Sequence, residues 1–531
     1  MSGIGKGIAT SSIARILKSK GYRATCVKID PYLNVDAGTM NPIEHGEVFV
    51  TDDGMETDQD IGNYERFLGE NILASNYMTS GSVYMSVLSR ERSLGYGGKC
   101  VQVVPHIPEE VIRRLSIVSK KTKADFILVE IGGTAGEYEN ILFLEAARMM
   151  HLRHPNNILF ILLSYLPIPA KIGEMKTKPT QHAVRALNSV GIQPDFIIAR
   201  AEASLDEPRK EKLSMFCNVS PKDIISAPDV ESIYQVPLNL EKERIGDKIL
   251  KKFGMKTTVR DLKDWSRMTH RAFFSKKKVK IGIVGKYFQT GNFTLADSYI
   301  SVIEALKHAS WFLNCQPEIL WLDAETYEKD SKKMKIELSD VAGILVPGGF
   351  GARGIEGKIK AIEFARKTKK PYFGLCYGMQ LAVVEFARHI AGMAGANTTE
   401  VNPKTKYPVI DVMAAQKEKI FVGKMGGSMR LGAFDCRLKE NTIARRAYAE
   451  RTISERHRHR YEFNSALQTV LESKGLVVSG VNPESNLVEI IELRDHPFFI
   501  GTQFHPEFKS RALEPHPLFI EFIKACLNYQ K

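Results

Sequence analysis

The sequence has no long uninterrupted run of apolar residues. Its longest apolar stretch, residues 158–166, is less than half of the roughly 20 residues that a membrane-spanning helix needs, and it is better interpreted as a buried strand. The N-terminus also has no basic segment followed by an apolar one, so we expect no signal peptide. These absences predict a soluble cytoplasmic protein.

Cysteine is also scarce, with seven residues in 531 and neither a CxxC pair nor a spacing typical of zinc ligands. An odd and dispersed set argues against a disulfide framework and fits a reducing compartment. Six of the cysteines are interpreted as small buried hydrophobic residues. Only Cys376 has neighbours that indicate chemistry.

The formal net charge is +13, from 74 Lys and Arg against 61 Asp and Glu. A basic balance permits nucleic-acid binding, but it suits equally an enzyme whose ligands are polyanionic nucleotides. The lysines are dispersed, and no basic stretch alternates with aromatic residues as in single-strand binders. We therefore expect small-molecule nucleotides as ligands and no nucleic acid.

Two successive α/β patterns divide a chain that is too long for a single core. In the first, apolar runs at 24–29, 126–131, 158–163 and 196–199 alternate with amphipathic stretches such as 8–20 and 141–152. The second begins at residue 280, with strands expected at 281–284, 343–346 and 371–374 and helices at 296–308 and 379–389. We predict two doubly wound, mostly parallel α/β domains, 1–262 and 280–531, joined by a linker at 263–279.

A glycine-flanked cysteine lies between an expected strand and an expected helix in the second domain. Residues 371–380 are Pro-Tyr-Phe-Gly-Leu-Cys-Tyr-Gly-Met-Gln. The glycines at 374 and 378 permit a sharp turn that lifts Cys376 into a cleft. The N-terminus of the following helix favours the thiolate, which is the form that attacks a carbonyl carbon.

Two further segments could complete such a site. His505 and Glu507, in Gln-Phe-His-Pro-Glu-Phe, are two residues apart and would lie on the same side of an extended segment, as a base and its orienting group. Residues 347–351, Pro-Gly-Gly-Phe-Gly, follow a buried strand and could supply oxyanion donors. Each motif alone is also compatible with a core cysteine, a loop or a turn. The three together in one α/β domain predict a thiol nucleophile.

On these residues the second domain resembles the class I glutamine amidotransferases, whose signatures are Gly-x-Cys-x-Gly-x-Gln and a late His-Pro-Glu. The resemblance implies that Cys376 is the nucleophile, His505 the base and Glu507 its orienting group in the hydrolysis of glutamine to glutamate and ammonia. It also implies an oxyanion region at Gly348 and Gly349. The implied glutamine contacts are Gly348, Gly349, Tyr377, Gly378, Met379, Gln380, Glu400 and Arg460.

The chain opens on a glycine-rich turn that leads directly into a helix. Residues 2–7, Ser-Gly-Ile-Gly-Lys-Gly, suit a triphosphate because backbone amides face the anion while Lys6 neutralises it, although a flexible helix cap is the alternative. Asp60 and Glu130 are candidate oxygen ligands for Mg²⁺. Residues 176–182 form either an anion- and base-recognition loop or a solvated charged loop.

Together these stretches resemble the CTP synthase family over practically the whole chain. The resemblance implies that ATP phosphorylates O4 of UTP and that ammonia released from glutamine passes internally and attacks C4, which gives CTP, ADP and phosphate. It further implies Mg²⁺, activation by GTP through residues 350–357, inhibition by CTP and a homotetramer, and leaves filament formation open. The segments that carry it are 28–36, 38–42, 45–50, 63–67, 129–134, 176–181, 425–432 and 455–461.

The same resemblance implies roles for residues of the first domain. Lys28 would contact the transferred phosphoryl group, and Asp60 and Glu130 would hold Mg²⁺. The implied ATP contacts are Gly3, Ile4, Gly5, Lys6, Gly7, Ile8, Asp60, Pro228, Asp229 and Val230. The implied UTP or CTP contacts are Ser2, Glu137, Tyr138, Glu139, Lys176, Thr177, Lys178, Pro179, Thr180, Gln181 and Lys212.

The chain departs from the family pattern in several places. Family members carry a first strand and two further glycines ahead of the position of Ser2, so we expect the first sheet to lack a central strand and the phosphate loop to be incomplete. Tyr377 stands where leucine is usual, which predicts an altered glutamine pocket. Residues 93–97 lack a usual aspartate, and residues 413–425 are fewer than in many relatives.

Two alternatives remain at this point. Another ATP-dependent amidotransferase, acting for example on a corrinoid acid or a purine nucleotide, is disfavoured by segments 176–181 and 63–67. The other is a catalytically weak nucleotide-binding protein that serves as a structural partner, since a fold does not guarantee its activity.

Overall fold

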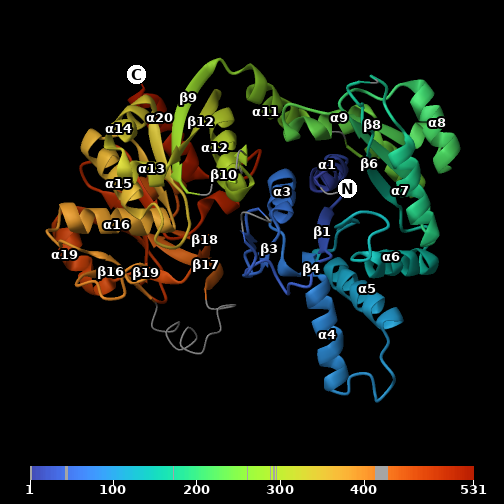
Figure 1. The fold of residues 1–531 in the computed structure, drawn as a ribbon, viewed down its shortest axis with the longest axis horizontal. Coiled ribbons are helices and arrows are strands. Elements are labelled where there is room, and N and C mark those ends of the chain that lie inside the picture. The colour runs from blue at the N-terminus through green and yellow to red at the C-terminus, as the bar shows by residue number, and fades with distance from the viewer. Residues whose placement is uncertain are drawn as a thin grey trace. The chain divides into compact units, whose positions relative to one another are not determined.

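The computed structural model of the chain describes residues 3–41, 46–171, 173–259, 261–286, 289–290, 293–294, 296–412 and 429–530. The chain forms two compact units (Figure 1): unit 1 comprises Met1–Ala37 and Asp60–Thr269, and unit 2 comprises Gly38–Gln59 and His270–Lys531. Residues 38–59, which the sequence placed in the first domain, thus belong to the second unit. No helix among the described residues is long and apolar enough to cross a membrane.

Unit 1 contains two three-stranded parallel sheets, ordered β4-β1-β5 and β6-β7-β8, rather than one continuous sheet. Every residue of β1 is buried, as expected for a strand covered on both faces. The register places Lys28 of β1 opposite Glu130 of β5, near the carboxyl ends of both strands, where α/β sheets bind ligands. The strands are β1 (Ala24–Asp30), β4 (Tyr77–Thr79), β5 (Phe126–Ile131), β6 (Ile161–Tyr165), β7 (Phe196–Ala201) and β8 (Ile224–Pro228).

Helices cover these sheets. Val27 and Met78 from the first sheet pack with Val83, Val111 and Phe143 from the helices in one core cluster. Figure 1 shows α4 and α5 side by side at the lower end of this unit. The helices are α1 (Lys6–Ser19), α3 (Gln59–Leu68), α4 (Ser80–Arg92), α5 (Val103–Thr122), α6 (Ile141–Arg153), α7 (Lys178–Ser189), α8 (Glu207–Cys217), α9 (Val236–Lys242), α10 (Ile245–Lys252) and α11 (Lys263–Phe274).

The segment expected as a linker, 263–279, is mostly helix α11 and runs directly into strand β9. Trp265 explains why the helix forms. Its ring is fully buried between Phe67 and Tyr234, with ring centroids 5.1 Å and 5.8 Å away, and its indole N–H donates to the carbonyl of Tyr234 at 2.8 Å. Buried Trp265, Met268 and Thr269, at helical spacing, thus fix a helix in the segment that was expected to be a linker.

Unit 2 is built on a nine-stranded sheet ordered β12-β9-β13-β14-β22-β21-β20-β17-β18. The first five strands are parallel, and the remaining pairs are antiparallel. The α/β class predicted for both halves is confirmed. The strands of this sheet are β9 (Lys277–Gly285), β12 (Cys315–Asp323), β13 (Gly343–Val346), β14 (Tyr372–Leu375), β17 (Arg430–Leu438), β18 (Thr452–His459), β20 (Leu476–Val481), β21 (Val488–Leu493) and β22 (Phe499–Thr502).

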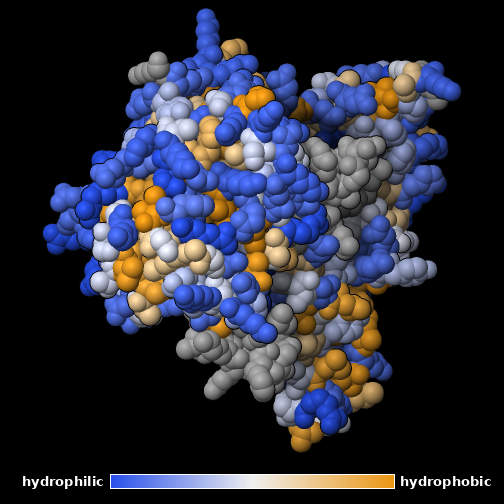
Figure 2. Space-filling model, turned by 60° about the vertical axis from the view of Figure 1, so that its left-hand side comes forward, coloured by the Kyte–Doolittle hydropathy of each residue, from blue (hydrophilic) through white to orange (hydrophobic). Residues whose placement is uncertain are grey.

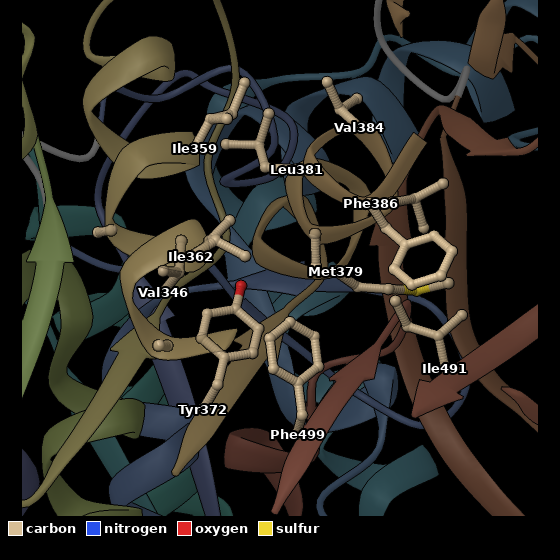
Figure 3. Close-up of a cluster of buried hydrophobic side chains, with 14 of the residues drawn as sticks. Val346, Ile359, Ile362, Tyr372, Met379, Leu381, Val384, Phe386, Ile491 and Phe499 are labelled. Carbon is tan, nitrogen blue, oxygen red and sulfur yellow. The ribbon is translucent and has the colours of Figure 1, made fainter. Parts of the chain in front are cut away.

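A hydrophobic cluster fixes the strand and helix that flank Cys376. Tyr372 of β14 stacks on Phe499 of β22 at 4.4 Å between ring centroids, and Figure 3 shows Met379 and Ile362 above them. The helices and short strands of unit 2 are α12 (Ile300–Phe312), α13 (Ala324–Lys329), α14 (Ser331–Asp340), α15 (Ile355–Thr368), α16 (Tyr377–His389), α18 (Ile443–Tyr448), α19 (Gln468–Ser473), α20 (Pro517–Tyr529), β2 (Phe49–Val50), β3 (Glu56–Thr57), β10 (Gln289–Thr290), β11 (Phe293–Thr294), β15 (Asn397–Thr398), β16 (Pro408–Val412) and β19 (Tyr461–Phe463).

Candidate active sites

Cys376 lies in a sharp turn between β14 and α16. Its backbone has φ 49° and ψ −98°, a conformation rare for residues other than glycine, and its N–H donates to the carbonyl of Thr502 at 2.7 Å. The turn needs glycine at 378, because an added methyl group would lie 2.2 Å from the carbonyl oxygen of Val346. The thiol is thereby held at the N-terminus of α16 and is only 5% exposed.

His505 and Glu507 lie together in unit 2, but not on an extended segment as expected. His505 begins a short 3₁₀ helix (Pro506–Lys509), and the turn brings Oε1 of Glu507 to 2.7 Å from Nδ1 of His505. The backbone N–H of His505 donates to the carbonyl of Arg456 at 2.8 Å. The 3₁₀ helix that begins at Pro506, rather than the alternation of side chains along a strand, therefore aligns the base and the carboxylate.

The imidazole of His505 is electrostatically biased towards its charged form. Burial alone would lower its pKa, but the charges of Glu507 and Cys376 outweigh burial and raise the pKa to about 10. A cationic His505 beside Cys376 favours a thiolate–imidazolium pair, as in other thiol hydrolases. Glu507 occupies Nδ1 of His505, which leaves Nε2 as the nitrogen that faces Cys376.

The glycine turn after β13 lies against the same two side chains. A methyl group added at Gly348 would lie 2.9 Å from Cε1 of His505 and 3.7 Å from Cβ of Cys376. Only glycine lets the backbone approach this closely. Gly349, the next residue, has open space around it except for the ammonium group of Lys358 at 3.9 Å.

The remaining expected glutamine contacts divide into two groups. Glu400 accepts the N–H of Gly351 at 2.8 Å; burial raises its pKa, although Lys286 and Arg460 oppose the rise. The Tyr377 hydroxyl donates to the carbonyl of Gly351 at 3.0 Å, so these groups surround the glycine turn. The side chain of Met379, by contrast, lies in the hydrophobic core (Figure 3), which leaves only its backbone for a ligand.

In unit 1, Lys28 is the centre of a buried charged cluster. Its ammonium group contacts the carboxylates of Asp60, of Glu130 at 3.0 Å and of Asp30 at 3.6 Å. The hydroxyl of Tyr64 donates to the second oxygen of Glu130. Three carboxylates thus surround one cation near the carboxyl ends of β1 and β5.

The two expected magnesium ligands repel each other. Burial raises the pKa of Glu130, and the charge of Asp60 adds to the rise, so that the pKa is about 7 despite the opposing charge of Lys28. A divalent cation would relieve this repulsion, so the carboxylate pair fits Mg²⁺, which is commonly held by one or two carboxylates and substrate phosphates. Within the described ranges, no group of three or more His, Cys, Asp or Glu is arranged as a complete metal cage.

The glycine-rich turn at the start of α1 lies beside Asp60. A methyl group at Gly7 would lie 2.0 Å from Oδ1 of Asp60, and Gly3 and Gly5 both have positive φ. Lys6 donates to the carbonyl of Gly133 at 3.1 Å. Ser2 lies outside the described residues. Ile4 is buried and Ile8 half-buried, so only their backbones could meet phosphate.

Arg200, which the sequence analysis did not single out, links two parts of the expected ATP site. Its guanidinium would lie 3.2 Å from a methyl group at Gly5, and its Nε donates to Asp229 at 3.0 Å. Pro228 ends β8, and Asp229 and Val230 follow it. Arginine inside an apolar strand, as in Phe-Ile-Ile-Ala-Arg-Ala, is the sequence signal that could have identified it.

The segment expected as a recognition loop at 176–182 is only partly a loop, because α7 begins at Lys178 with Pro179 in its first turn. The side chains of Thr180 and Gln181 are buried: Thr180 bonds Ser164 at 2.8 Å, and Gln181 donates to Thr177 at 3.1 Å. Only the residues before the buried Thr180 remain for direct contact with a ligand.

Some of the exposed charged residues of this expected nucleotide site lie close together. Lys176 and Lys212 both lower the pKa of Glu174, so they lie around one carboxylate. Glu137 accepts the N–H of Thr134 at 2.7 Å, which lowers its pKa, while Tyr138 is 90% exposed and Glu139 is also exposed. No hydrogen bond or ion pair joins 137–139 to 176–181 among the described residues.

Comparison with known sequences identifies both halves. The family described as CTP synthase N-terminus matches residues 1–255, and glutamine amidotransferase class-I matches residues 294–525. A CTP synthase of Caldanaerobacter subterraneus is 49% identical over 529 residues, which covers 99% of this chain and 97% of that protein. A CTP synthase of Methanothermobacter thermautotrophicus is 48% identical over 530 residues, with the same shares covered.

The chain belongs to the CTP synthase family. It is therefore a glutamine-hydrolysing ligase, and the resemblance seen in the sequence is confirmed. Among solved structures, the glutaminase domain of Trypanosoma brucei CTPS with bound acivicin is similar, with a TM-score of 0.44, 36% identity, and coverage of 47% of this chain and 94% of that one.

One residue of this CTP synthase family member that sequence reasoning missed lies under the glycine turn. Lys358 of α15 is 1% exposed, its ammonium group lies 5.4 Å from the ring centroid of Tyr377, and it has no hydrogen-bond partner within the described part of the chain. Burial lowers its pKa to about 7, with Lys286 contributing. Ile355, Ala361 and Ile362 lie three or four residues away on the same face of α15, so helical periodicity is the signal that could have placed Lys358 among the buried residues.

Proposed function

We propose that this chain makes CTP from UTP, using ATP and the ammonia released from glutamine. The observation that carries the proposal is the thiol site: in a chain that matches a CTP synthase over 99% of its length, Cys376 is held in a strained turn beside a buried His505–Glu507 pair. A protein retained only for nucleotide binding would have no need of this arrangement.

In the glutaminase half, Sγ of Cys376 attacks the side-chain carbonyl of glutamine. The oxyanion is stabilised by amides of the turn at Gly348 and Gly349, and the C–N bond breaks as His505 gives its proton to the leaving ammonia. Water then hydrolyses the thioester to glutamate, with His505 as base. Glu400 and Arg460, near Tyr377, supply charges for the amino and carboxylate groups of glutamine.

In the synthetase half, ATP transfers its γ-phosphoryl group to O4 of UTP. Ammonia then attacks C4 and displaces phosphate, which gives CTP. Lys28 contacts the phosphoryl group in transfer, while Gly3, Gly5, Lys6 and Gly7 hold the ATP phosphates. Mg²⁺ held by Asp60 and Glu130 would neutralise the phosphate charge during transfer.

The remaining contacts are proposals of the same kind. Pro228, Asp229 and Val230 line the ATP site, together with Ile4 and Ile8. The pyrimidine nucleotide, UTP or inhibitory CTP, meets Ser2, Glu137, Tyr138, Glu139, Lys176, Thr177, Lys178, Pro179, Thr180, Gln181 and Lys212. For the two buried members, Thr180 and Gln181, the contact is indirect, through the helix start that they stabilise.

Assembly and regulation follow the family as proposals. We propose a cytoplasmic homotetramer that GTP activates through residues 350–357. An exposed apolar surface supports assembly: Leu33, Met85 and Leu88 are 78%, 53% and 60% exposed. Figure 2 shows hydrophobic side chains gathered on the lower part of the molecule, where Figure 1 places α4 and α5. Soluble monomers rarely leave such a surface uncovered.

The test is CTP formation by the purified chain with ATP, Mg²⁺, UTP, GTP and glutamine. Cys376→Ala is the matched variant: it should make no CTP from glutamine and should keep making CTP from ammonium chloride. CTP from neither nitrogen source would overturn the synthetase assignment. CTP from glutamine with Cys376→Ala would overturn the assigned nucleophile.

A further inference from the structure

Gln503 is a buried residue of the thiol site that the glutaminase mechanism leaves without a role. It follows β22 directly, its side chain is fully buried, and its backbone N–H donates to the carbonyl of Glu489 at 2.8 Å. Its side-chain Nε2 lies 3.7 Å from Sγ of Cys376. The amide group is therefore next to the reacting atom and held there by the sheet.

The orientation of this amide follows from a chain of hydrogen bonds. Nε2 of Gln380 donates to the carbonyl of Tyr461 at 2.9 Å and to Oε1 of Gln503 at 3.2 Å. A backbone carbonyl can only accept, so the NH₂ end of Gln380 must face Tyr461. The group of Gln503 that meets this NH₂ must then be its oxygen, which leaves the NH₂ of Gln503 directed at the sulfur.

Besides His505, the sulfur has one amide donor and one carbonyl acceptor within reach. The carbonyl of Arg458, on β18, is 3.9 Å from Sγ and can accept a proton only from the neutral thiol. The NH₂ of Gln503 can donate to the thiolate. The other groups around the sulfur are His505, with Glu507 behind it, and the close backbone of Gly348.

We propose that Gln503 is a catalytic residue that stabilises the thiolate of Cys376 by hydrogen bonding, and that Gln380 positions it. A hydrogen bond to a charged acceptor contributes more free energy than one to a neutral acceptor. The bond from Gln503 therefore shifts the equilibrium between thiol and thiolate towards the thiolate. The inference rests on the proposed role of Cys376 as nucleophile. It gives Gln380 a positioning role in addition to any contact with glutamine.

The test compares three variants with the unchanged protein. Gln503→Glu keeps the shape and the acceptor for Gln380 but removes the donor, while Gln503→Met removes the donor without adding a charge. Gln380→Leu leaves Gln503 in place and removes the group that orients it. Gln530→Glu, at an exposed position after α20, is the matched control for the Gln-to-Glu change.

The first readout is the rate at which iodoacetamide alkylates Cys376 as a function of pH, followed by mass spectrometry of the peptide that contains it. This readout needs no turnover, and peptide resolution separates Cys376 from exposed Cys100. We expect the midpoint of the profile to move to higher pH by roughly one to two units in Gln503→Met, by more in Gln503→Glu, and by less in Gln380→Leu.

The second readout is glutaminase kinetics. We expect kcat for glutamine hydrolysis to fall roughly 10- to 100-fold in Gln503→Met with KM little changed, because the lost bond is to the nucleophile and not to glutamine. CTP formation from ammonium chloride should stay as in the unchanged protein, because the synthetase residues lie in unit 1. Thermal unfolding shows whether unit 2 of each variant folds. If both Gln503 variants fail to fold, Gln380→Leu carries the test.

The outcomes separate this inference from the proposed function. A folded Gln503→Met, or in its absence a folded Gln380→Leu, with an unchanged alkylation profile would overturn the role of Gln503 even where Cys376→Ala is inactive. Glutamine hydrolysis that survives Cys376→Ala would instead overturn the nucleophile itself. A shifted midpoint with Gln530→Glu unchanged supports the inference.

Discussion

Nε of Arg458 donates to Oε1 of Glu56 at 2.8 Å, a contact between residues 402 positions apart in the chain. The carbonyl of the same Arg458 faces the sulfur of Cys376 at 3.9 Å. Two residues earlier on β18, Arg456 pairs with Asp52. The carbonyl of Arg456 accepts the backbone N–H of His505 at 2.8 Å. The hairpin of β2 and β3 thus holds, through two arginines, the strand that contacts both partners of the thiol site.

Replacing Glu56 by glutamine should therefore weaken both unit 2 and the glutaminase. Glu56 is 5% exposed, so losing its charge leaves Arg458 poorly compensated, and we expect the free energy of unfolding to fall by roughly 1–3 kcal/mol. Glutamine hydrolysis should slow as the carbonyl of Arg458 shifts beside Cys376. Thermal unfolding and a glutaminase assay measure the two effects.

The control for Glu56→Gln is Glu440→Gln, which removes an exposed partner of Arg445 at 3.3 Å. A surface pair of this kind contributes less than about 1 kcal/mol. Equal destabilisation by the two variants would show that the hairpin does not stabilise β18.

Magnesium should stabilise unit 1 more at pH 8 than at pH 6. The pKa of Glu130 is raised from 4.5 to about 7, first by burial and then by Asp60, so the folded state holds a proton that the unfolded state has lost between these values. Stability of the metal-free protein therefore falls as pH rises from about 4.5 to 7. Mg²⁺ needs the deprotonated carboxylate, so the rise in melting temperature on adding Mg²⁺ should grow as the pH rises through about 7.

Glu130→Gln should remove this pH-dependent response to Mg²⁺. The matched control is Glu145→Gln on α6, whose carboxylate pairs only with Arg148 on its own helix among the described contacts. Glu145→Gln should retain the full response. A Mg²⁺ effect that persists unchanged in Glu130→Gln would exclude Glu130 as a ligand.

Tyr377 should tighten glutamine binding in this chain. Its hydroxyl donates to the carbonyl of Gly351 and so fixes the turn whose N–H bonds Glu400. Tyr377→Phe should raise KM for glutamine by roughly fivefold, which corresponds to about 1 kcal/mol for one hydrogen bond, with CTP formation from ammonia unchanged. Tyr327→Phe, which also loses a hydroxyl bond, to Glu337 at 2.8 Å, should leave KM unchanged. If both variants raise KM equally, the loss of a hydroxyl bond acts through the stability of unit 2 as a whole and not through the turn at Gly351.

The sequence predicts those parts of the fold and site that depend on local pattern. The strands at 126–131 and 343–346 have the predicted bounds, because apolar runs flanked by polar residues determine a buried strand. The motifs around Cys376, His505 and Glu507 could be found because they depend on a turn and a short spacing. Thr180, Val184 and Leu187 follow helical spacing, so the start of α7 at Lys178 could also have been predicted from periodicity.

What the sequence did not predict depends on contacts between distant segments. Gln503, which follows β22, acquires its orientation from Gln380 of α16 and Tyr461 of β19. Residues 38–59 pack with unit 2 through ion pairs to β18 that no local pattern indicates. Trp265 converts an expected linker into a helix because a pocket formed by Phe67 and Tyr234 exists only in the folded unit.

Lys358 should make unit 2 less stable at low pH than at high pH. Burial lowers its pKa from 10.5 to about 7, so between these values the unfolded state binds a proton that the folded state does not, and stability rises with pH across that window. Lys358→Met removes the buried charge, so it should stabilise the protein at pH 6, on the order of 2–5 kcal/mol, with the gain shrinking towards pH 10. Chemical unfolding at several pH values measures this, and Lys332→Met on the exposed face of α14 is the control. A gain that is the same at pH 6 and pH 10 would show that Lys358 is not held as a strained cation, and that the benefit comes from packing alone.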